Sequence, residues 1–205
     1  MHSHDHTPIT APGYYEVMEI AMRELLPEKG LIRPAEIRRQ TEVLDSRTPQ
    51  LGAKVVAKAW LDSAFRARLL QNGRTACEEL GITFYDDPEL IVLENTRGVH
   101  NLIVCTLCSC YPRPVLGLPP GWYKQKPYRA RAVKQPRAVL AEFGTVIPDD
   151  VEIRISDSTA AVRYLVLPLR PAGTEGWSEE ELAALVTRDT MIGVATIEQQ
   201  SRRIQ

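Results

Sequence analysis

The chain has 205 residues, of which 44% are hydrophobic and 25% are charged, and its formal net charge at pH 7 is −1. This length and apolar content allow one substantial domain with an extension. A nearly neutral chain is not expected to bind nucleic acid in general, because general nucleic-acid binders are usually basic. No apolar run approaches the roughly 18 residues that a membrane span requires, and the first residues lack the apolar segment of a secretory leader. These features predict a cytoplasmic protein that neither enters a membrane nor is secreted.

The first fifty residues are expected to contain a tail and a helical arm. Residues 1–12 are polar and hold three of the four histidines, and we expect a mobile tail there. From Tyr14 to Pro27, apolar residues recur at helical spacing. A second helix is expected from Pro34, since proline suits the first helical position. Two helices ahead of any strand indicate an N-terminal helical arm over residues 13–50, which either binds a partner subunit or folds back on its own domain.

The remaining residues, 51–205, are expected to form one domain of short helices and strands. Helices are expected over 51–60, 62–70, 75–80 and 136–143 and from Ser178, and strands over 90–94, 101–104, 151–155 and 164–169. Helices first and then a mostly β domain with a few helices are typical of the α+β class.

Two further segments of this domain are punctuated by proline or rich in basic residues. The prolines of 111–114 and 118–121 are expected to exclude both strand and helix, because proline lacks a backbone donor and fixes φ. The basic residues of 124–137 are interleaved with one aromatic residue, Tyr128. This pattern favours a solvated or subunit-facing surface over a nucleic-acid site.

Three of the four cysteines lie within six positions, with the spacing Cys-x-x-Cys-x-Cys. Cys105, Cys108 and Cys110 directly follow an expected buried strand, and three soft ligands on one short loop indicate a metal site. Clustered cysteines in a chain of this length favour a reducing compartment over a disulfide scaffold. Cys77 lies apart, on the apolar face of an expected helix, and is interpreted as a buried apolar residue.

The spacing alone leaves the kind of metal site open. A structural zinc ion would need a fourth ligand, and His100 and Cys77 are poor candidates for it; an iron–sulfur cluster would need more cysteines. The amides of Ser109 and Cys110 are expected to face the same concavity as the thiolates. A trivalent ion could bind three sulfurs and two deprotonated amide nitrogens, which leaves one position for water or substrate. A catalytic metal and a structural metal both remain open from the residues.

The stretch Val-Cys-Thr-Leu-Cys-Ser-Cys at 104–110 resembles the claw motif of the metal-bearing subunit of the nitrile hydratase family. The resemblance covers nearly the whole chain after residue 14. It continues through Gly-Ala-Lys-Val-Val-Ala-Lys-Ala-Trp at 52–60, Glu-Asn-Thr at 94–96, Pro-Val-Leu-Gly-Leu-Pro-Pro at 114–120, Trp-Tyr-Lys at 122–124, Arg-Pro-Ala-Gly-Thr-Glu at 170–175 and Leu-Val-Thr-Arg-Asp at 185–189. It implies an α+β fold in which a helical arm precedes a layered α-β-β-α domain.

The resemblance also implies the metal and its ligands. One low-spin, non-corrin ion per subunit would be held by the thiols of Cys105, Cys108 and Cys110 and by the amides of Ser109 and Cys110. Thr106 stands where iron-type members have serine, which implies cobalt(III). The family pattern implies a sulfinate at Cys108, a sulfenate at Cys110 and an axial thiolate at Cys105; such oxidations are known for cysteine.

The activity implied is that of a hydro-lyase, which hydrates a nitrile to an amide. Hydroxide, an activated water or the sulfenate oxygen of Cys110 would attack the nitrile carbon, so Cys110, Ser109 and Arg113 are the expected catalytic residues. Glu94, Asp157 and Arg163 match positions proposed to support the ligands, and ordinary structural salt bridging is the alternative for all three.

The resemblance implies partners as well. In the family, arginines of a β-type subunit hydrogen-bond to the oxidised sulfurs, and such charge-assisted bonds stabilise anions. None of these arginines is in this chain. We therefore expect a β-type subunit or two small β-like subunits, and an activator or cobalt-loading chaperone.

Three positions depart from the usual cobalt-type pattern. Arg113 and Ser156 stand where tryptophan is common, and Ala161 where many members have glutamate. An arginine in place of an aromatic wall favours an anion over a small apolar nitrile. Arg113 resembles the γ subunit of thiocyanate hydrolase, a branch of the family that converts thiocyanate to carbonyl sulfide and ammonia. The substrate is therefore expected to be a nitrile, including a large polar one, or thiocyanate. A non-catalytic cobalt-carrying subunit is a third alternative.

Overall fold

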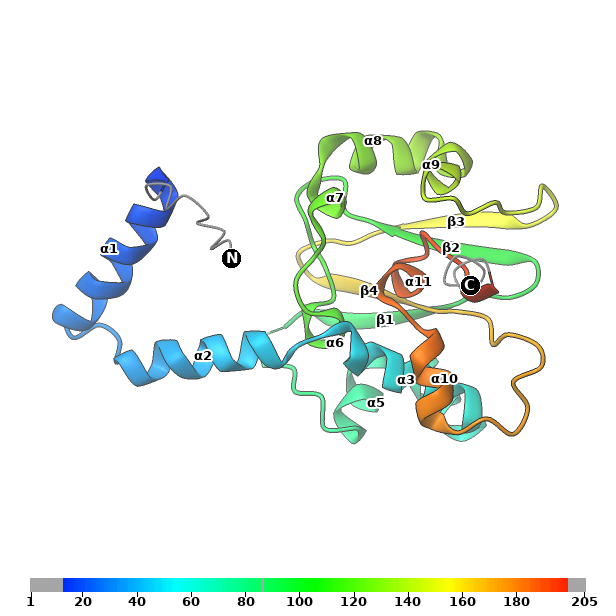
Figure 1. The fold of residues 1–205 in the computed structure, drawn as a ribbon, viewed down its shortest axis with the longest axis horizontal. Coiled ribbons are helices and arrows are strands. Elements are labelled where there is room, and N and C mark those ends of the chain that lie inside the picture. Colours follow the sequence, from blue (N-terminus) through cyan, green and yellow to red (C-terminus); the bar gives the residue numbers. More distant parts are fainter. Residues whose placement is uncertain (1–12, 86, 199–205) are drawn as a thin grey trace, which may run out of the picture. The chain divides into compact units, whose positions relative to one another are not determined.

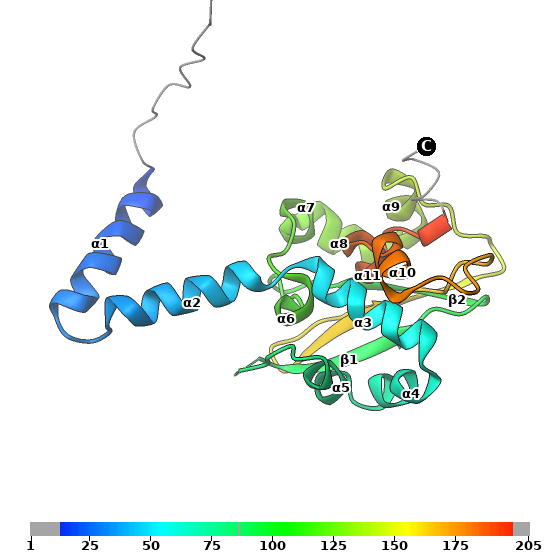
Figure 2. The ribbon, with the colours of Figure 1, turned by 60° about the horizontal axis from the view of Figure 1, so that its bottom comes forward.

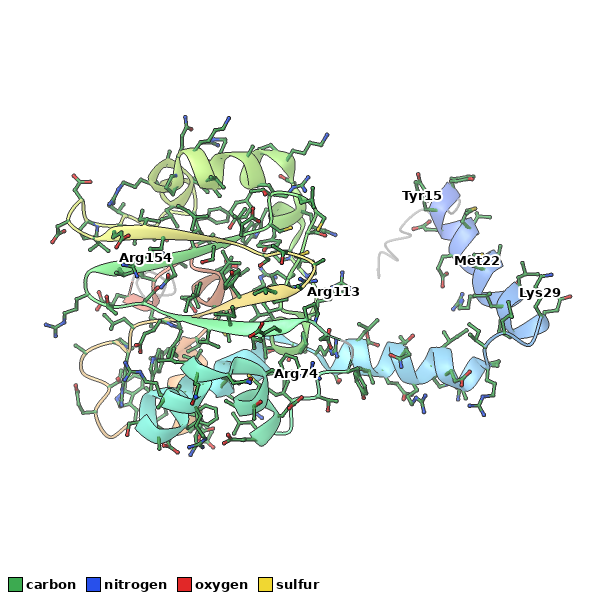
Figure 3. The ribbon with its side chains drawn as sticks, turned by 180° about the vertical axis from the view of Figure 1, so that it is seen from behind. Tyr15, Met22, Lys29, Arg74, Arg113 and Arg154 are labelled. Atoms are coloured by element: carbon green, nitrogen blue, oxygen red, sulfur yellow. The ribbon has the colours of Figure 1, made fainter. Side chains whose placement is uncertain are left out.

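A computed structural model describes residues 13–85 and 87–198. Contacts within the chain divide it into two units, residues 1–44 and residues 45–205. The first unit contains helix α1 (Tyr14–Glu28) and most of helix α2 (Pro34–Ser46). Neither helix has a buried residue. Apolar side chains of α1 such as Tyr15, which is 83% exposed, and Met22 therefore project into solvent (Figure 3).

Local capping explains where the two helices of the first unit begin. The Glu16 carboxylate accepts a hydrogen bond of 2.8 Å from the Gly13 N–H at the start of α1. Glu36 does the same for the Arg33 N–H, at 2.7 Å, at the start of α2. In the first turn of a helix the N–H groups have no partner within the helix, so these carboxylates stabilise both helix starts.

The second unit is built around four short strands. They are β1 (Glu89–Glu94), β2 (Val99–Val104), β3 (Glu152–Asp157) and β4 (Val162–Leu167). Strand β1 pairs in parallel with β4, so that Glu89 lies opposite Val162, and β2 pairs in parallel with β3, so that Val99 lies opposite Glu152. The segment 95–98 connects β1 with β2, which belong to different pairs, and therefore makes no hairpin.

Helices cover the strands on two sides. They are α3 (Pro49–Leu61), α4 (Ser63–Gln71), α5 (Gly73–Glu79), α6 (Arg113–Leu116), α7 (Gly121–Lys124), α8 (Lys126–Lys134), α9 (Pro136–Glu142), α10 (Glu179–Leu185) and α11 (Arg188–Ile192). In Figure 1, α8 and α9 lie on one side of the strands and α3, α5 and α10 on the other. Figure 2 shows α10 beside α3, with which it is in contact. This arrangement confirms the expected layered α-β-β-α domain.

The proline-rich segments depart from the expectation that they exclude helix. Helix α6 begins at Arg113 with Pro114 as its second residue, and α7 begins directly after Pro120. A proline in the first turn loses no helical hydrogen bond, because the N–H that it lacks would have no partner there. Prolines therefore start these one-turn helices. Helices α8 and α11 were also not expected from the sequence.

The core fills the space between the helices and the strands. Val55, Val56 and Ala59 of α3 are buried, as are Leu102 and Ile103 of β2. Cys77 of α5 is fully buried, and burial raises the pKa of its thiol to about 12. This agrees with its interpretation as an apolar residue.

Polar contacts fix the first half of β2 from both sides. The buried His100 ring, 4% exposed, has its Nε2 2.7 Å from the carbonyl oxygen of Gly193, at the end of α11. Asn101 donates its backbone N–H to Asn95 Oδ1 at 2.8 Å. Gly193 has φ +90°, and a Cβ atom at this position would overlap the carbonyl oxygen of Asn101. The turn after α11 therefore packs directly on the backbone of β2.

Candidate metal centre

The claw loop, residues 105–110, begins where β2 ends at Val104. Cys105 continues the buried strand and is 0% exposed, whereas Cys108 is exposed and Cys110 is half-buried. Leu107, between them in the chain, is 89% exposed. The loop therefore has a buried base and an open tip.

The three sulfur atoms are close enough to bind one ion. The Sγ of Cys108 lies 3.5 Å from that of Cys105 and 3.2 Å from that of Cys110, and all three lie within 4.8 Å of one another. With metal–sulfur bonds of about 2.3 Å, neighbouring sulfurs are about 3.3 Å apart around an octahedral ion and about 3.8 Å apart around a tetrahedral one. The two distances fit the octahedral spacing better, and three soft donors suit a transition metal.

The thiols also perturb one another. Hydrogen bonds from Cys110 and then Cys105 lower the pKa of Cys108 to about 7. Burial, together with the hydrogen bond to Cys108, raises the pKa of Cys110 to about 12. The hydrogen bond between these two sulfurs lowers the pKa of Cys108 and raises that of Cys110. Of these two thiols, Cys108 therefore ionises first.

Three side chains hold the backbone of the loop from outside. Asp157 of β3 accepts hydrogen bonds from the N–H of Thr106, at 2.9 Å, and from its hydroxyl, at 2.5 Å. The Tyr123 hydroxyl donates to the carbonyl oxygen of Cys110 at 2.9 Å. Arg129 of α8 donates from Nη1 to the carbonyl oxygen of Cys108 at 2.6 Å. Elements on different sides of the loop thus determine its conformation.

The three residues expected to support the ligands lie in different surroundings. Asp157 lies opposite Val104 in the paired strands and contacts the loop. The positive charge of Arg163 acts on the thiol of Cys110 and partly counters the rise in its pKa. Glu94 ends β1, beside the first half of β2, and its carboxylate pairs with Arg66 of α4 at 2.5 Å. It therefore lies away from the loop that follows β2, in a contact that matches the salt-bridge alternative.

Arg113 is the first residue of α6, and its side chain is exposed. Figure 3 shows it at the surface, beyond the ends of the strands. Within the described residues, its guanidinium forms no ion pair. Ser109, between two of the thiols, is half-buried. Of the two other departures from the family pattern, Ser156 lies in β3 opposite Ile103, and Ala161 is exposed before β4.

Tyr123 and Arg129 were not predicted to contact the loop. Tyr123 stands in a segment that matches the family, but no pattern gives it a role. Arg129 is one of several basic residues that were interpreted together as a surface. Their spacing from the cysteines in the sequence does not indicate that they contact the claw loop. The tertiary packing of α7 and α8 brings both side chains to the loop.

An open hollow of about 490 Å³ lies beside the loop, lined by Thr106, Lys126, Arg129, Ala130, Val133 and Lys134. Another hollow, of about 350 Å³, lies at the opposite end of β2, where Asn95 and Val99 contribute to its lining. Of these two hollows, the larger one adjoins the claw loop. No helix of the described residues is both long and apolar enough to cross a membrane.

Comparisons with known proteins agree with this geometry. Residues 13–195 match the family model described as nitrile hydratase, alpha chain. The low-molecular-weight cobalt-containing nitrile hydratase subunit alpha of Rhodococcus rhodochrous is 58% identical over 176 residues, 85% of each chain. Thiocyanate hydrolase subunit gamma of Thiobacillus thioparus is 43% identical over 192 residues, 88% of this chain and 79% of that one.

A solved structure extends the likeness to the fold. A double mutant of the Fe-type nitrile hydratase from Comamonas testosteroni Ni1 superposes with a TM-score of 0.85 at 45% identity, covering 92% of each chain. The family model covers most of the chain, and the relatives match along most of their own length. The chain therefore belongs to the nitrile hydratase alpha-chain family.

Proposed function

We propose that this chain is the metal-bearing subunit of a cobalt nitrile hydratase, which hydrates a C≡N group to an amide. The observation that carries the proposal is the group of three sulfurs within 4.8 Å of one another at the end of a buried strand. It is supported by the 58% identity to a subunit whose name includes cobalt.

The claw loop supplies the donors that this function needs. Cys105, Cys108 and Cys110 would hold one cobalt(III) ion per chain, together with the amide nitrogens of Ser109 and Cys110. When bound, the ion would act as a Lewis acid that polarises the nitrile and activates water. The loop's fixed backbone would keep these donors oriented before the ion arrives, which is the arrangement that favours a precise site.

The burial of the sulfurs supports a particular pattern of oxidation. Cys105 is fully buried, Cys110 is half-buried and Cys108 is exposed. Oxidation of cysteine follows the exposure of its sulfur as well as its thiolate character. We therefore propose a thiolate at Cys105, a sulfenate at Cys110 and a sulfinate at Cys108. The sulfenate oxygen of Cys110 would accept a proton from the water that adds to the nitrile carbon.

Partners follow from the open tip of the loop. Leu107 and Cys108 are exposed, so water reaches the tip of the loop in the chain alone. A β-type subunit, or two small β-like subunits, would cover the tip and supply cations to the oxidised sulfurs. Closing a site excludes water and strengthens the electrostatic interactions in it. An activator or cobalt-loading chaperone would deliver the ion.

Thiocyanate hydrolysis is the second candidate function, and Arg113 favours it. The guanidinium is exposed near the claw loop and forms no ion pair within the described residues, so it is available to an anion. The 43% identity to a thiocyanate hydrolase subunit is consistent with this candidate. Replacing Arg113 with tryptophan should lower kcat/KM for thiocyanate relative to a small aliphatic nitrile by about tenfold or more, the effect of about 1.4 kcal/mol. An unchanged ratio would remove Arg113 from substrate selection.

The proposed function is tested on the chain expressed with its partner subunits in cobalt-supplemented medium. The purified complex is assayed with aliphatic and heteroaromatic nitriles and with thiocyanate, and its cobalt content is measured. Nitrile turnover with about one cobalt per chain is expected. Turnover of thiocyanate without any nitrile would support the second candidate instead. A cobalt-loaded complex with neither activity, and with all three sulfurs unoxidised by mass spectrometry, would indicate a non-catalytic carrier.

A further inference from the structure

We propose that Arg129 is a positioning residue for the metal centre. It holds the peptide unit between Cys108 and Ser109 in the orientation that presents the Ser109 nitrogen, and it compensates the negative charge that this unit carries in the loaded site. The inference rests on the proposed function in one respect, namely that the claw loop binds an ion through this nitrogen.

Arg129 Nη1 lies 2.6 Å from the carbonyl oxygen of Cys108, a short distance for a charge-assisted hydrogen bond. This oxygen and the nitrogen of Ser109 belong to one planar peptide unit, so fixing the oxygen also fixes the direction of the nitrogen. Thr106 and Cys110 are held by other residues. Within the described residues, Arg129 is the side chain that holds this middle peptide from outside the loop.

The Nε of Arg129 is buried, and within the described residues it has no hydrogen-bond partner and the guanidinium forms no ion pair. Burying a donor without a partner is unfavourable. Arg131, two residues further along α8, instead forms a two-bond contact with Glu142. The position of Arg129 is thus not explained by structural ion pairing, and its charge is left to the claw loop.

A peptide nitrogen that bound a metal ion would lose its proton to water and form a nitrogen–metal bond, without transfer of an electron. Resonance in the peptide unit places part of the resulting negative charge on the carbonyl oxygen. For Ser109, that oxygen belongs to Cys108 and already accepts from the Arg129 guanidinium. A cation at this atom stabilises the donor form of the loop.

Lys126 and Lys134 also line the hollow beside the loop, but within the described residues neither lysine donates a hydrogen bond to the loop. Their exposed charges act through solvent, where screening is strong. If the whole basic surface assisted the site, replacing any of its residues would slow cobalt uptake. If the Arg129 hydrogen bond is responsible, replacing Arg129 will slow uptake far more than replacing its neighbours.

The experiment compares cobalt uptake by the full chain in complex with its partners. Metal-free complex is mixed with Co²⁺ in air together with the activator or cobalt-loading chaperone, and cobalt content and the sulfur-to-cobalt absorption band are followed with time. The variants are Arg129→Gln and Arg129→Lys, with Arg131→Gln as the control on the same helix and Lys126→Gln as the control for charge. Melting temperatures check that each variant folds.

We expect Arg129→Gln to take up cobalt at least tenfold more slowly than wild type, Arg129→Lys to recover part of the loss, and both controls to behave as wild type. Equal uptake by Arg129→Gln and wild type would overturn the inference and leave the proposed function intact. A similar loss in Lys126→Gln would also overturn it, in favour of a general basic surface. If the wild-type complex took up no cobalt, the proposed function would fail first, and the inference with it.

Discussion

Replacing Gly193 with alanine is expected to destabilise the domain strongly, because this glycine lies against the backbone of β2. Its φ of +90° is in the left-handed region, where an alanine costs about 1–2 kcal/mol by itself. The added Cβ would also overlap the carbonyl oxygen of Asn101 and lie 3.1 Å from the Cα of Leu102. The obstacle is backbone in a buried strand, so the turn after α11 must move.

Moving this turn breaks the contact of 2.7 Å between His100 Nε2 and the Gly193 carbonyl. Separating two buried polar groups that were hydrogen-bonded lowers the free energy of unfolding by about 1–3 kcal/mol. Added to the conformational cost, this predicts a loss of roughly 2–5 kcal/mol in the free energy of unfolding. The matched control is Gly173→Ala, where φ is +78° and a Cβ meets no atom within 4 Å. The control should show the conformational cost alone.

Urea unfolding of the two variants and the wild-type chain measures the difference. We expect Gly193→Ala to cost about 1–3 kcal/mol more than Gly173→Ala, which corresponds to a melting temperature lower by about 2–12 °C. Because Cys105 directly follows β2, cobalt retention should fall in the first variant only. Equal destabilisation of the two variants would refute the packing of this turn on β2.

Two further predictions concern titratable groups. Burial lowers the pKa of His100 below 6.5 despite its contact with Gly193, so the unfolded chain takes up this proton first as the pH falls. The contribution of His100 to the free energy of unfolding is thus complete above about pH 6.5. It declines below that pH, with a slope of at most about 1.4 kcal/mol per pH unit. His100→Gln should make the free energy of unfolding, measured with urea, depend less on pH between pH 7 and 5. An unchanged pH dependence would contradict the lowered pKa of His100. In the metal-free chain at neutral pH, a short iodoacetamide pulse should label Cys108, whose pKa is lowered to about 7, well before the buried Cys77; peptide mass spectrometry that found both equally labelled would contradict the burial of Cys77.

The strands could be predicted from the sequence, but their pairing could not. Short apolar segments identified all four strands to within two residues, and alternation of apolar residues supported the strand at 151–155. A local pattern of this kind carries no information about which strand lies beside which. Parallel pairing of β1 with β4 joins segments separated by most of the domain. The helices α6 and α7 were missed because proline was interpreted only as a breaker, although it also suits a first turn.

The cluster of three thiols could be predicted from the sequence, because Cys105, Cys108 and Cys110 are neighbours in the chain and their spacing indicates a shared ion. Asp157 was expected from the family resemblance, and the structure places it against Thr106. Arg129 could not be found in either way. Its contact depends on how α8 packs beside the loop, and helical periodicity does not specify that.

The parallel pairing of the strands has a consequence for how the protein is made. Strand β2 and the claw loop leave the ribosome well before β3, which contains Asp157 and lies beside β2 in the finished domain. Pairings between segments distant in sequence also form slowly. The nascent chain therefore carries its three thiols unheld for an interval, during which oxygen or a stray ion can reach them. We expect productive cobalt capture to belong to the last stage of folding, so that the timing of synthesis and metal supply affects the yield of active protein.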